Sequence, residues 1–249
     1  MFNFFKKKDN YTSLNEVQSD YSALMVDMHS HVLPGIDDGA QTPEESLVLI
    51  RKMIELGIKK IIATPHVMAD HYRNTSETIN NSLGILKAEL NKEKIEITVE
   101  AAAEYYFDET FENLVNQKKL MTMGNNFTLF ELPFISNPRN LIQIITKMRE
   151  FEYKPILAHP ERYLYLKLHD YKIIKNHGCL LQLNTLSLAG YYGKEVKKKA
   201  EELADNHLVD FISSDMHHQR HAAALQDALS APYVKNIISD KSLKNSLLI

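Results

Sequence analysis

The chain has little of what several protein classes require. Its 249 residues include one cysteine and no tryptophan. A single cysteine cannot form an intramolecular disulfide, which suits a reducing compartment and predicts a cytoplasmic protein. No apolar run approaches the ~20 residues that a transmembrane helix needs. The sequence therefore argues against a secreted, disulfide-rich protein and predicts no transmembrane segment.

Other chemistries are excluded by missing motifs. The 29 Lys and Arg residues against 32 Asp and Glu residues give a formal charge of −3, without the basic excess that nucleic-acid binding favours. Glycine-rich nucleotide-binding loops and the Gly-x-Ser-x-Gly elbow of serine hydrolases do not occur. Cys179 cannot begin a Cys-x5-Arg phosphate loop, because the residue six positions later is Thr185.

The chain reads as one domain with a short extension. Residues 1–23 are polar and include three consecutive lysines, which is typical of an arm that is ordered only if something holds it. From residue 24 to 249 no repeat, linker or low-complexity run interrupts the pattern. We therefore predict an N-terminal arm over 1–23 and a single domain over 24–249.

Within that domain, short apolar runs alternate with amphipathic stretches. The apolar runs predict strands over 24–28, 60–64, 95–103, 127–132, 154–158, 179–184 and 210–214. Helical periodicity is clearest over 43–56, where Thr42 and Pro43 mark the start, and over 138–151 and 194–206. Seven strand–helix units favour an α/β fold with a parallel sheet, closed as a TIM-barrel-like (β/α) barrel. An open doubly wound sheet remains the alternative.

Polar residues stand where these strands end. Six of the seven strands finish in His, Asp or Glu, and the carboxyl ends of parallel strands share one functional face. Imidazole and carboxylate together favour divalent metal ions. The set is too large for one ion, so we predict two or three. It consists of His29, His31, Asp37, His66, Glu104, Glu131, His159, Asp215 and His217.

Each residue also has a purely structural interpretation. A lone His66 or His159 is more often a satisfied structural histidine, and Asp37 could cap a turn. However, Glu131 lies between two apolar residues, where an unpaired carboxylate would be costly. Six other histidines are expected in surface or loop positions: His71, His169, His177, His207, His218 and His221.

Several motifs together resemble one family. Residues 26–39 are similar to the opening motif of the polymerase-and-histidinol-phosphatase (PHP) superfamily. Within them, the sequence Leu-Pro-Gly-Ile-Asp-Asp-Gly resembles the motif of the bacterial CpsB/CapC branch. The later motifs follow in the same order: Thr64-Pro65-His66, Glu131-Leu132-Pro133, His159-Pro160-Glu161-Arg162 and Ser214-Asp215-Met216-His217. The resemblance spans nearly the whole chain.

The resemblance implies a single distorted (β/α)7 barrel with a trinuclear metal site. His29, His31, Glu104 and Asp215 would hold one ion, and Glu104 would bridge to a second ion held by Glu131 and His159. The third ion would take Asp37, His66 and His217. Arg162 would contact phosphate, and Arg220 is a candidate for a second contact.

The same resemblance implies a function. The chain would be a metal-dependent protein-tyrosine phosphatase, a phosphoric monoester hydrolase that uses metal-activated hydroxide. Manganese is the expected cofactor, with iron or zinc as alternatives. The expected partner is a phosphotyrosine protein, namely a bacterial tyrosine kinase of capsule or exopolysaccharide synthesis. The alternatives are a histidinol-phosphatase-like phosphoesterase and a non-catalytic binding module that retains the barrel.

Overall fold

The computed structural model describes residues 20–249 and contains only parallel strand pairs among its named strands. One sheet has the order β1-β2-β4, and the other has the order β3-β5-β6-β7-β8-β9. The strands are β1 (Val26–Asp27), β2 (Lys60–Ala63), β3 (His66–Val67), β4 (Thr98–Ala101), β5 (Glu104–Tyr106), β6 (Phe127–Glu131), β7 (Lys154–Ala158), β8 (Leu180–Asn184) and β9 (Phe211–Ser213).

The two sheets share chain segments. The segment of β2 continues into β3 after Thr64 and Pro65, and that of β4 continues into β5 after two alanines. The nine strands therefore fall in seven segments, but β3 and β5 lie just beyond the predicted ranges 60–64 and 95–103. The α/β class with parallel sheets is therefore confirmed. The strand expected over 95–103 begins only at Thr98, and the segment near residue 24 is reduced to the two residues of β1.

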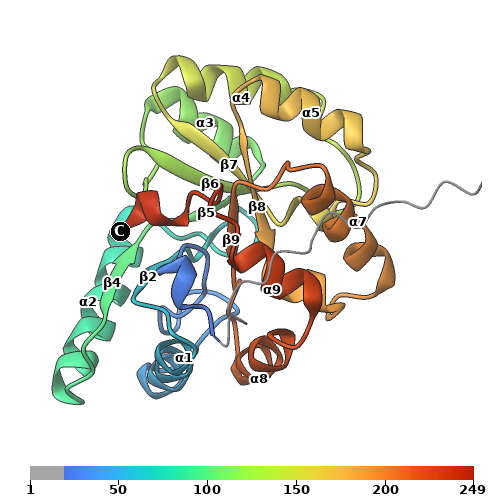
Figure 1. The fold of residues 1–249 in the computed structure, drawn as a ribbon. Helices are drawn as coiled ribbons and strands as arrows, with labels where there is room; N and C mark the ends of the chain where they lie inside the picture. The colour runs from blue at the N-terminus through green and yellow to red at the C-terminus, as the bar shows by residue number, and fades with distance from the viewer. Residues whose placement is uncertain (1–19) are drawn as a thin grey trace, which may run out of the picture.

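Helices lie around the outside of the strands (Figure 1). The predicted helices over 43–56, 138–151 and 194–206 are confirmed as α1, α4 and α7, and Thr42 caps α1 by accepting a hydrogen bond from the Glu45 amide. The helices are α1 (Pro43–Glu55), α2 (Ser76–Lys92), α3 (Glu109–Gln117), α4 (Leu141–Glu150), α5 (Leu168–Asn176), α6 (Thr185–Ala189), α7 (Lys194–Asp205), α8 (Gln219–Ala228) and α9 (Pro232–Ile238), with 3-10 turns η1 (Ser22–Leu24), η2 (Pro160–Arg162) and η3 (Asn245–Leu248). In the described part of the chain, no helix is long and apolar enough to cross a membrane.

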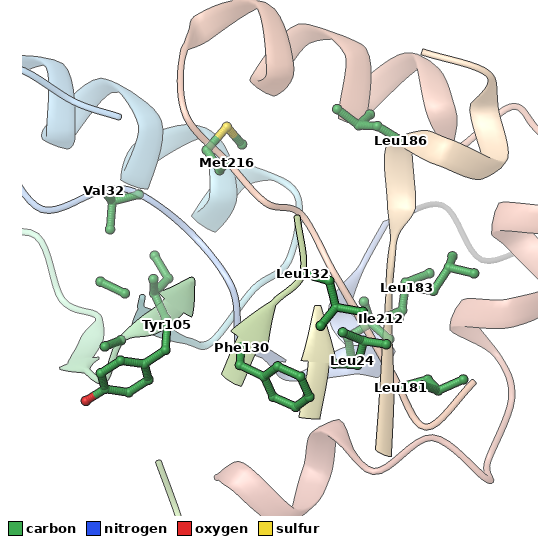
Figure 2. Close-up of a cluster of buried hydrophobic side chains, with 14 of the residues drawn as sticks. Leu24, Val32, Tyr105, Phe130, Leu132, Leu181, Leu183, Leu186, Ile212 and Met216 are labelled. Carbon is green, nitrogen blue, oxygen red and sulfur yellow. The ribbon is translucent and has the colours of Figure 1, made fainter. Parts of the chain in front are cut away.

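The core has two layers because side chains alternate along each strand. Phe130 of β6, Leu181 and Leu183 of β8 and Ile212 of β9 belong to a large buried cluster that also includes helix residues (Figure 2). The alternate positions form a second buried cluster, which includes Phe127, Leu129 and Phe211.

Tyr21 belongs to the packed domain, three residues before the expected boundary. Its side chain is 3% exposed, its amide donates to the Leu56 carbonyl at 2.7 Å, and its hydroxyl donates to the Leu225 carbonyl at 2.7 Å. This tyrosine therefore ties the chain before β1 to both α1 and α8. The first 19 residues of the expected arm lie outside the described residues.

Candidate metal centre

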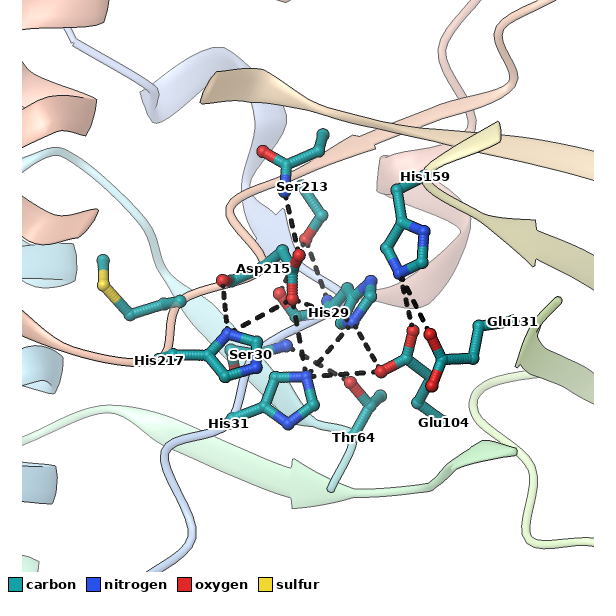
Figure 3. A network of polar contacts seen from close by, with 12 residues as sticks. His29, Ser30, His31, Thr64, Glu104, Glu131, His159, Ser213, Asp215 and His217 are labelled. Atoms are coloured by element: carbon teal, nitrogen blue, oxygen red, sulfur yellow. Dashed lines mark hydrogen bonds and ion pairs between the residues drawn. The ribbon is translucent and has the colours of Figure 1, made fainter. Parts of the chain in front are cut away.

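The strand ends bring eight of the nine predicted ligands into one cluster (Figure 3). In Figure 3, His31 and His217 lie on one side of the cluster and Glu104, Glu131 and His159 on the other, with His29 between them. Even the two most accessible of these side chains, those of His66 and His217, are only 14% exposed. Residues almost 190 positions apart in the sequence thus meet in one buried volume.

Glu104 lies at the centre of the cluster. Its Oε2 atom is 3.3 Å from His29 Nε2, 3.4 Å from His31 Nε2 and 3.1 Å from His66 Nδ1. Its other oxygen, Oε1, is 3.0 Å from His159 Nε2. One carboxylate therefore faces four imidazoles, which is the arrangement that a bridging ligand needs.

The ligand atoms fall into four overlapping groups, each with all atoms within 4.8 Å of one another. His29, His31, His66 and Glu104 each belong to two groups, so neighbouring ions could share ligands. The groups are His29-His31-Glu104, His29-His159-Asp215, His66-Glu104-Glu131 and His31-Asp38-His66-His217.

Two buried atoms of the cluster show that its donor set suits a cation. Glu104 Oε2 and His66 Nδ1 are fully buried, and neither has a hydrogen-bond partner, although they are 3.1 Å apart. Leaving a buried polar atom unsatisfied costs about 1–3 kcal/mol, and more for a charged group. A divalent ion with imidazole and carboxylate ligands would remove that cost.

The electrostatics of the cluster favour the same conclusion. Burial alone would raise the pKa values of Glu104 and Asp215, but the surrounding histidines hold both well below the usual range. Burial would likewise lower the pKa of His66, but the Glu104 carboxylate raises it to about 10. A cation that binds to the His66 ring would therefore have to displace a proton from it.

The carboxylate that faces the third group is Asp38, not Asp37. Asp38 Oδ1 lies 3.5 Å from His66 Nε2 and 3.6 Å from His217 Nε2. The Asp37 carboxylate is instead turned to His31 Nδ1, which is 2.7 Å from its Oδ2 atom, and accepts hydrogen bonds from the Gly39 and His66 amides. Asp37 thus orients the His31 ring, and Asp38 is the carboxylate that joins His31, His66 and His217 in the third group.

Strand β8 contributes residues that the sequence analysis missed. Gln182 Oε1 is 2.8 Å from His29 Nδ1, and Asn184 Nδ2 donates to Asp215 Oδ2 at 2.9 Å. Both side chains are fully buried. Their signal was present as two polar residues at i and i+2 in the apolar run 179–184, which places both on one face of the strand.

Asp27 supports the cluster from below. Its carboxylate accepts hydrogen bonds from the hydroxyls of Ser213 and Ser214 and, at 3.1 Å, from the Ser214 amide. Burial raises its pKa to about 6. Asp27 therefore fixes the end of β1, which leads to His29, against the end of β9, which leads to Asp215.

Two residues of the cluster have unusual backbone conformations. His159 has φ 30° and Asp215 has φ 51°, both in the left-handed region that residues other than glycine rarely adopt. Hydrogen bonds hold the backbone in these conformations. The Asp215 amide donates to the His29 carbonyl, and the Arg162 amide donates to the His159 carbonyl. Such strain, of order 1–3 kcal/mol per residue, is typical of functional sites.

The two arginines differ sharply. The Arg162 guanidinium is 4.6 Å from the centre of the Phe134 ring and 5.1 Å from that of Tyr192, and its Nη1 atom is 3.6 Å from Asp215 Oδ2. Arg220 is exposed in the first turn of α8, and no hydrogen bond or ion pair joins it to the described cluster. The geometry therefore supports a phosphate contact for Arg162 and provides none for Arg220.

One of the six remaining histidines is misplaced by the sequence analysis. His221 is only 7% exposed and packs edge-on against Tyr191, Tyr192 and His217 of the cluster. Burial lowers its pKa to about 4. The exposed histidines are His71, His169, His177 and His207, as expected, whereas the His218 side chain caps α8.

Proteins of known activity have sequences similar to this chain. The tyrosine-protein phosphatase YwqE of Bacillus subtilis is 32% identical over 78% of this chain and 77% of its own length. The tyrosine-protein phosphatase CpsB of Streptococcus agalactiae is 28% identical over 78% of this chain and 83% of its own.

Solved structures give the same result. A structure described among those of YwqE from Bacillus subtilis and CpsB from Streptococcus pneumoniae, "unique metal-dependent tyrosine phosphatases", matches with a TM-score of 0.79 and 27% identity, over 90% of this chain and 94% of that one. A histidinol phosphate phosphatase from Lactococcus lactis shares only the fold, with a TM-score of 0.51 and 12% identity over 83% of this chain and 92% of that one. The family model for capsular polysaccharide synthesis, CpsB/CapC, matches residues 25–245. The chain belongs to the CpsB/CapC family.

Proposed function

We propose that the chain is a metal-dependent protein-tyrosine phosphatase, a phosphoric monoester hydrolase that acts on phosphotyrosine. The observation that carries this proposal is the set of overlapping imidazole–carboxylate groups that share Glu104. The relatives named as tyrosine-protein phosphatases support the substrate class. The capsule-synthesis family supports a bacterial tyrosine kinase as the phosphorylated partner, and the single buried cysteine suits a cytoplasmic location.

The donor set is suited to two or three divalent ions, with manganese as the first choice and iron or zinc as alternatives. His29, His31, Glu104 and Asp215 would hold the first ion, and Glu104, Glu131 and His159 the second. The third would take His66, His217 and, in place of Asp37, Asp38. Gln182 and Asp37 would hold His29 and His31 in the tautomer whose Nε2 atom is free to bind.

Two or more bound ions would supply an activated water and neutralise phosphate oxygens. Arg162 binds a phosphate oxygen beside Asp215, where its guanidinium can make two parallel hydrogen bonds. Asn184 and Arg162 both contact Asp215 Oδ2 and so keep that carboxylate in place. Because a phenol has a pKa of only about 10, tyrosine leaves without strong help from a general acid.

Cysteine catalysis is excluded by the structure. Cys179 is 1% exposed, and burial raises the pKa of its thiol far above the usual range. A thiol that stays protonated is a poor nucleophile. The reaction therefore does not pass through a phosphocysteine intermediate.

We also propose that the strands close into a distorted seven-unit barrel. The chain beyond β1 meets the chain beyond β9, where the His31 amide donates to the Met216 carbonyl at 2.8 Å and the Asp215 amide donates to the His29 carbonyl at 2.9 Å. A parallel bridge between Ser30 and Met216 lies at the same place. Closure at this seam would explain how the ligands after β1 and β9 come to share one site.

The test compares two substrates in one assay. Phosphate release is measured with added Mn²⁺ from a phosphotyrosine peptide and from histidinol phosphate, with His159→Ala as the blank. We expect the peptide to be preferred and the activity to be lost in the variant. A preference for histidinol phosphate would keep the metal centre but contradict the protein substrate. No release from either would contradict the phosphatase and favour a non-catalytic module.

A further inference from the structure

Phe134 is an exposed aromatic residue that contacts the edge of the cluster. It follows β6 by three residues, and it is 46% exposed although it stacks on three buried or half-buried groups. Its ring lies 5.9 Å from that of His159 with an interplanar angle of 26°, 5.7 Å from that of Tyr163, and 4.6 Å from the Arg162 guanidinium. The aromatic ring is thus held in place on one side and open to solvent on another.

The position of Arg162 decides where a substrate's leaving group must lie. In an aryl phosphate a single ester oxygen separates the phosphorus atom from the aromatic ring. If the phosphate contacts Arg162 and the ligand cluster, the aromatic ring of the substrate must therefore lie next to them. Phe134 is the exposed aromatic side chain that contacts both Arg162 and the ligand His159.

We propose that Phe134 forms the leaving-group subsite, and that it selects aryl over alkyl phosphates by stacking against the substrate's ring. This inference rests on the proposed function, because it assumes that phosphate binds beside Arg162. Tyr192 holds the other flank of the arginine, and its hydroxyl accepts a hydrogen bond from Asn184. Phe134 can therefore contact the substrate without being the sole support of the arginine.

Tyr72 is the competing platform. Its ring stacks on the ligand His66 at 5.5 Å with an interplanar angle of 15°, and the residue is partly buried. It contacts His66 and His71, however, and no contact joins it to Arg162 among the described residues. A leaving group next to the arginine would therefore meet Phe134 first, which makes Tyr72→Leu the matched control.

The experiment measures binding, so it does not depend on turnover. Benzylphosphonate, ethylphosphonate and inorganic phosphate are titrated by calorimetry into the Mn²⁺-loaded wild type and into the Phe134→Leu, Phe134→Tyr and Tyr72→Leu variants. Aromatic pairs contribute enough beyond area burial to change affinity about 3- to 10-fold. We expect Phe134→Leu to weaken benzylphosphonate by this factor and to change ethylphosphonate and phosphate less than twofold. Phe134→Tyr should keep the wild-type affinity for benzylphosphonate, and Tyr72→Leu should leave the ratio of benzylphosphonate to ethylphosphonate affinity unchanged.

Other results would overturn the inference in distinguishable ways. Equal weakening of all three ligands by Phe134→Leu would mean that the ring only supports Arg162. Loss of the aryl preference in Tyr72→Leu alone would place the leaving group at Tyr72. An aryl preference that depends on Phe134 in a protein that releases no phosphate from phosphotyrosine would contradict the proposed function but keep the subsite. Phosphatase activity in a protein whose aryl preference does not depend on Phe134 would keep the proposed function but contradict the subsite.

Discussion

The two ends of the strands are both largely buried on their inner face but are stabilised in different ways. On one face of β6, Phe127 and Leu129 pack into the apolar interior cluster, whereas Glu131, the next residue on that face, enters the metal centre. The same change occurs between Phe211 of β9 and Asp215 beyond it. The position along the strand, not the burial, decides whether a residue serves stability or chemistry.

The apolar end needs nothing from outside the chain. Its residues fill the space among themselves, and the Phe127 and Phe211 rings meet edge-on at 5.6 Å. Close packing of this kind stabilises the fold directly. The cluster consists of Val26, Met28, Ile62, Ala102, Met123, Phe127, Leu129, Ile156, Ala158, Phe211 and Leu248.

The polar end is incomplete by itself. Buried charges are costly unless they are paired and hydrogen-bonded. Here Glu104 Oε2 and His66 Nδ1 have no hydrogen-bond partner, and the raised pKa of His66 leaves on that ring a proton that a metal ion would replace. We conclude that the polar end is suited to binding metal ions, and that the apolar end supplies the stability that offsets the cost of burying its charges.

The largest effect is expected at the centre of the polar end. Glu104→Gln removes the charge that faces His29, His31 and His66, so we expect the loss of at least one ion and a fall in kcat/KM of about 10³-fold. Phosphate release and metal content by mass spectrometry measure this. Glu100→Gln on β4, which breaks only a half-exposed pair with Lys60, is the matched control. Full activity in Glu104→Gln would contradict the bridging role.

The apolar end is tested at Leu129, two residues before Glu131 on β6. Leu129 is fully buried, so Leu129→Ala should lower the free energy of unfolding by about 2–5 kcal/mol through lost burial and a cavity. Denaturant unfolding measures the loss. The metal content per folded molecule should stay at the wild-type value, and a drop in metal content would show that the two ends are not separable.

A smaller effect is expected where β8 supports the metal centre. Gln182→Leu removes the acceptor 2.8 Å from His29 Nδ1, so the ring loses its preferred tautomer and orientation. Support of this kind typically changes metal affinity by about 10- to 100-fold. Competition with a chelating dye measures the affinity, and Gln182→Glu, which keeps an acceptor, should recover most of it. An unchanged affinity in Gln182→Leu would show that Gln182 only fills space.

The last effect is a pH dependence of metal binding, which needs no substitution. Neighbouring carboxylates raise the pKa values of His29, His31 and His66, the last to about 10, although burial opposes this shift. In the metal-free protein, stability from these histidines is present below pH 6.5 and declines as the pH rises towards 10.

Metal binding must displace these protons, so the affinity should rise with pH by about tenfold per pH unit for each proton released. Calorimetry in buffers of different ionisation enthalpy counts those protons. The metal-induced increase in Tm should be larger at pH 8 than at pH 6. Binding without proton release would contradict the assigned protonation.

The sequence predicted the α/β class and the gathering of strand-end His, Asp and Glu side chains, because both follow one rule. Apolar strands in a parallel fold bring their ends together, so a His, Asp or Glu after each strand is enough to predict a shared cluster. The rule fails where the local path of the chain decides. It cannot choose between Asp37 and Asp38, because the turn before Gly39 determines which of the two faces the cluster.

Other omissions have different physical causes. Gln182 and Asn184 are neutral, so a search of the strand ends for His, Asp and Glu does not identify them. His221 lies on a helix whose buried face is set by packing against the two tyrosines before α7, a contact that periodicity alone does not reveal. Tyr21 is held by the carbonyl of Leu225, 204 residues away in the sequence.

The most direct test of the whole account is to count metal ions while activity returns. Metal-free protein is titrated with Mn²⁺, and both bound metal per chain and phosphate release from a phosphotyrosine peptide are followed at each step. We predict that activity stays low until more than one ion is bound per chain and is complete at two or three. Full activity with one ion or none would contradict the claim that the polar end is a multi-ion catalytic centre.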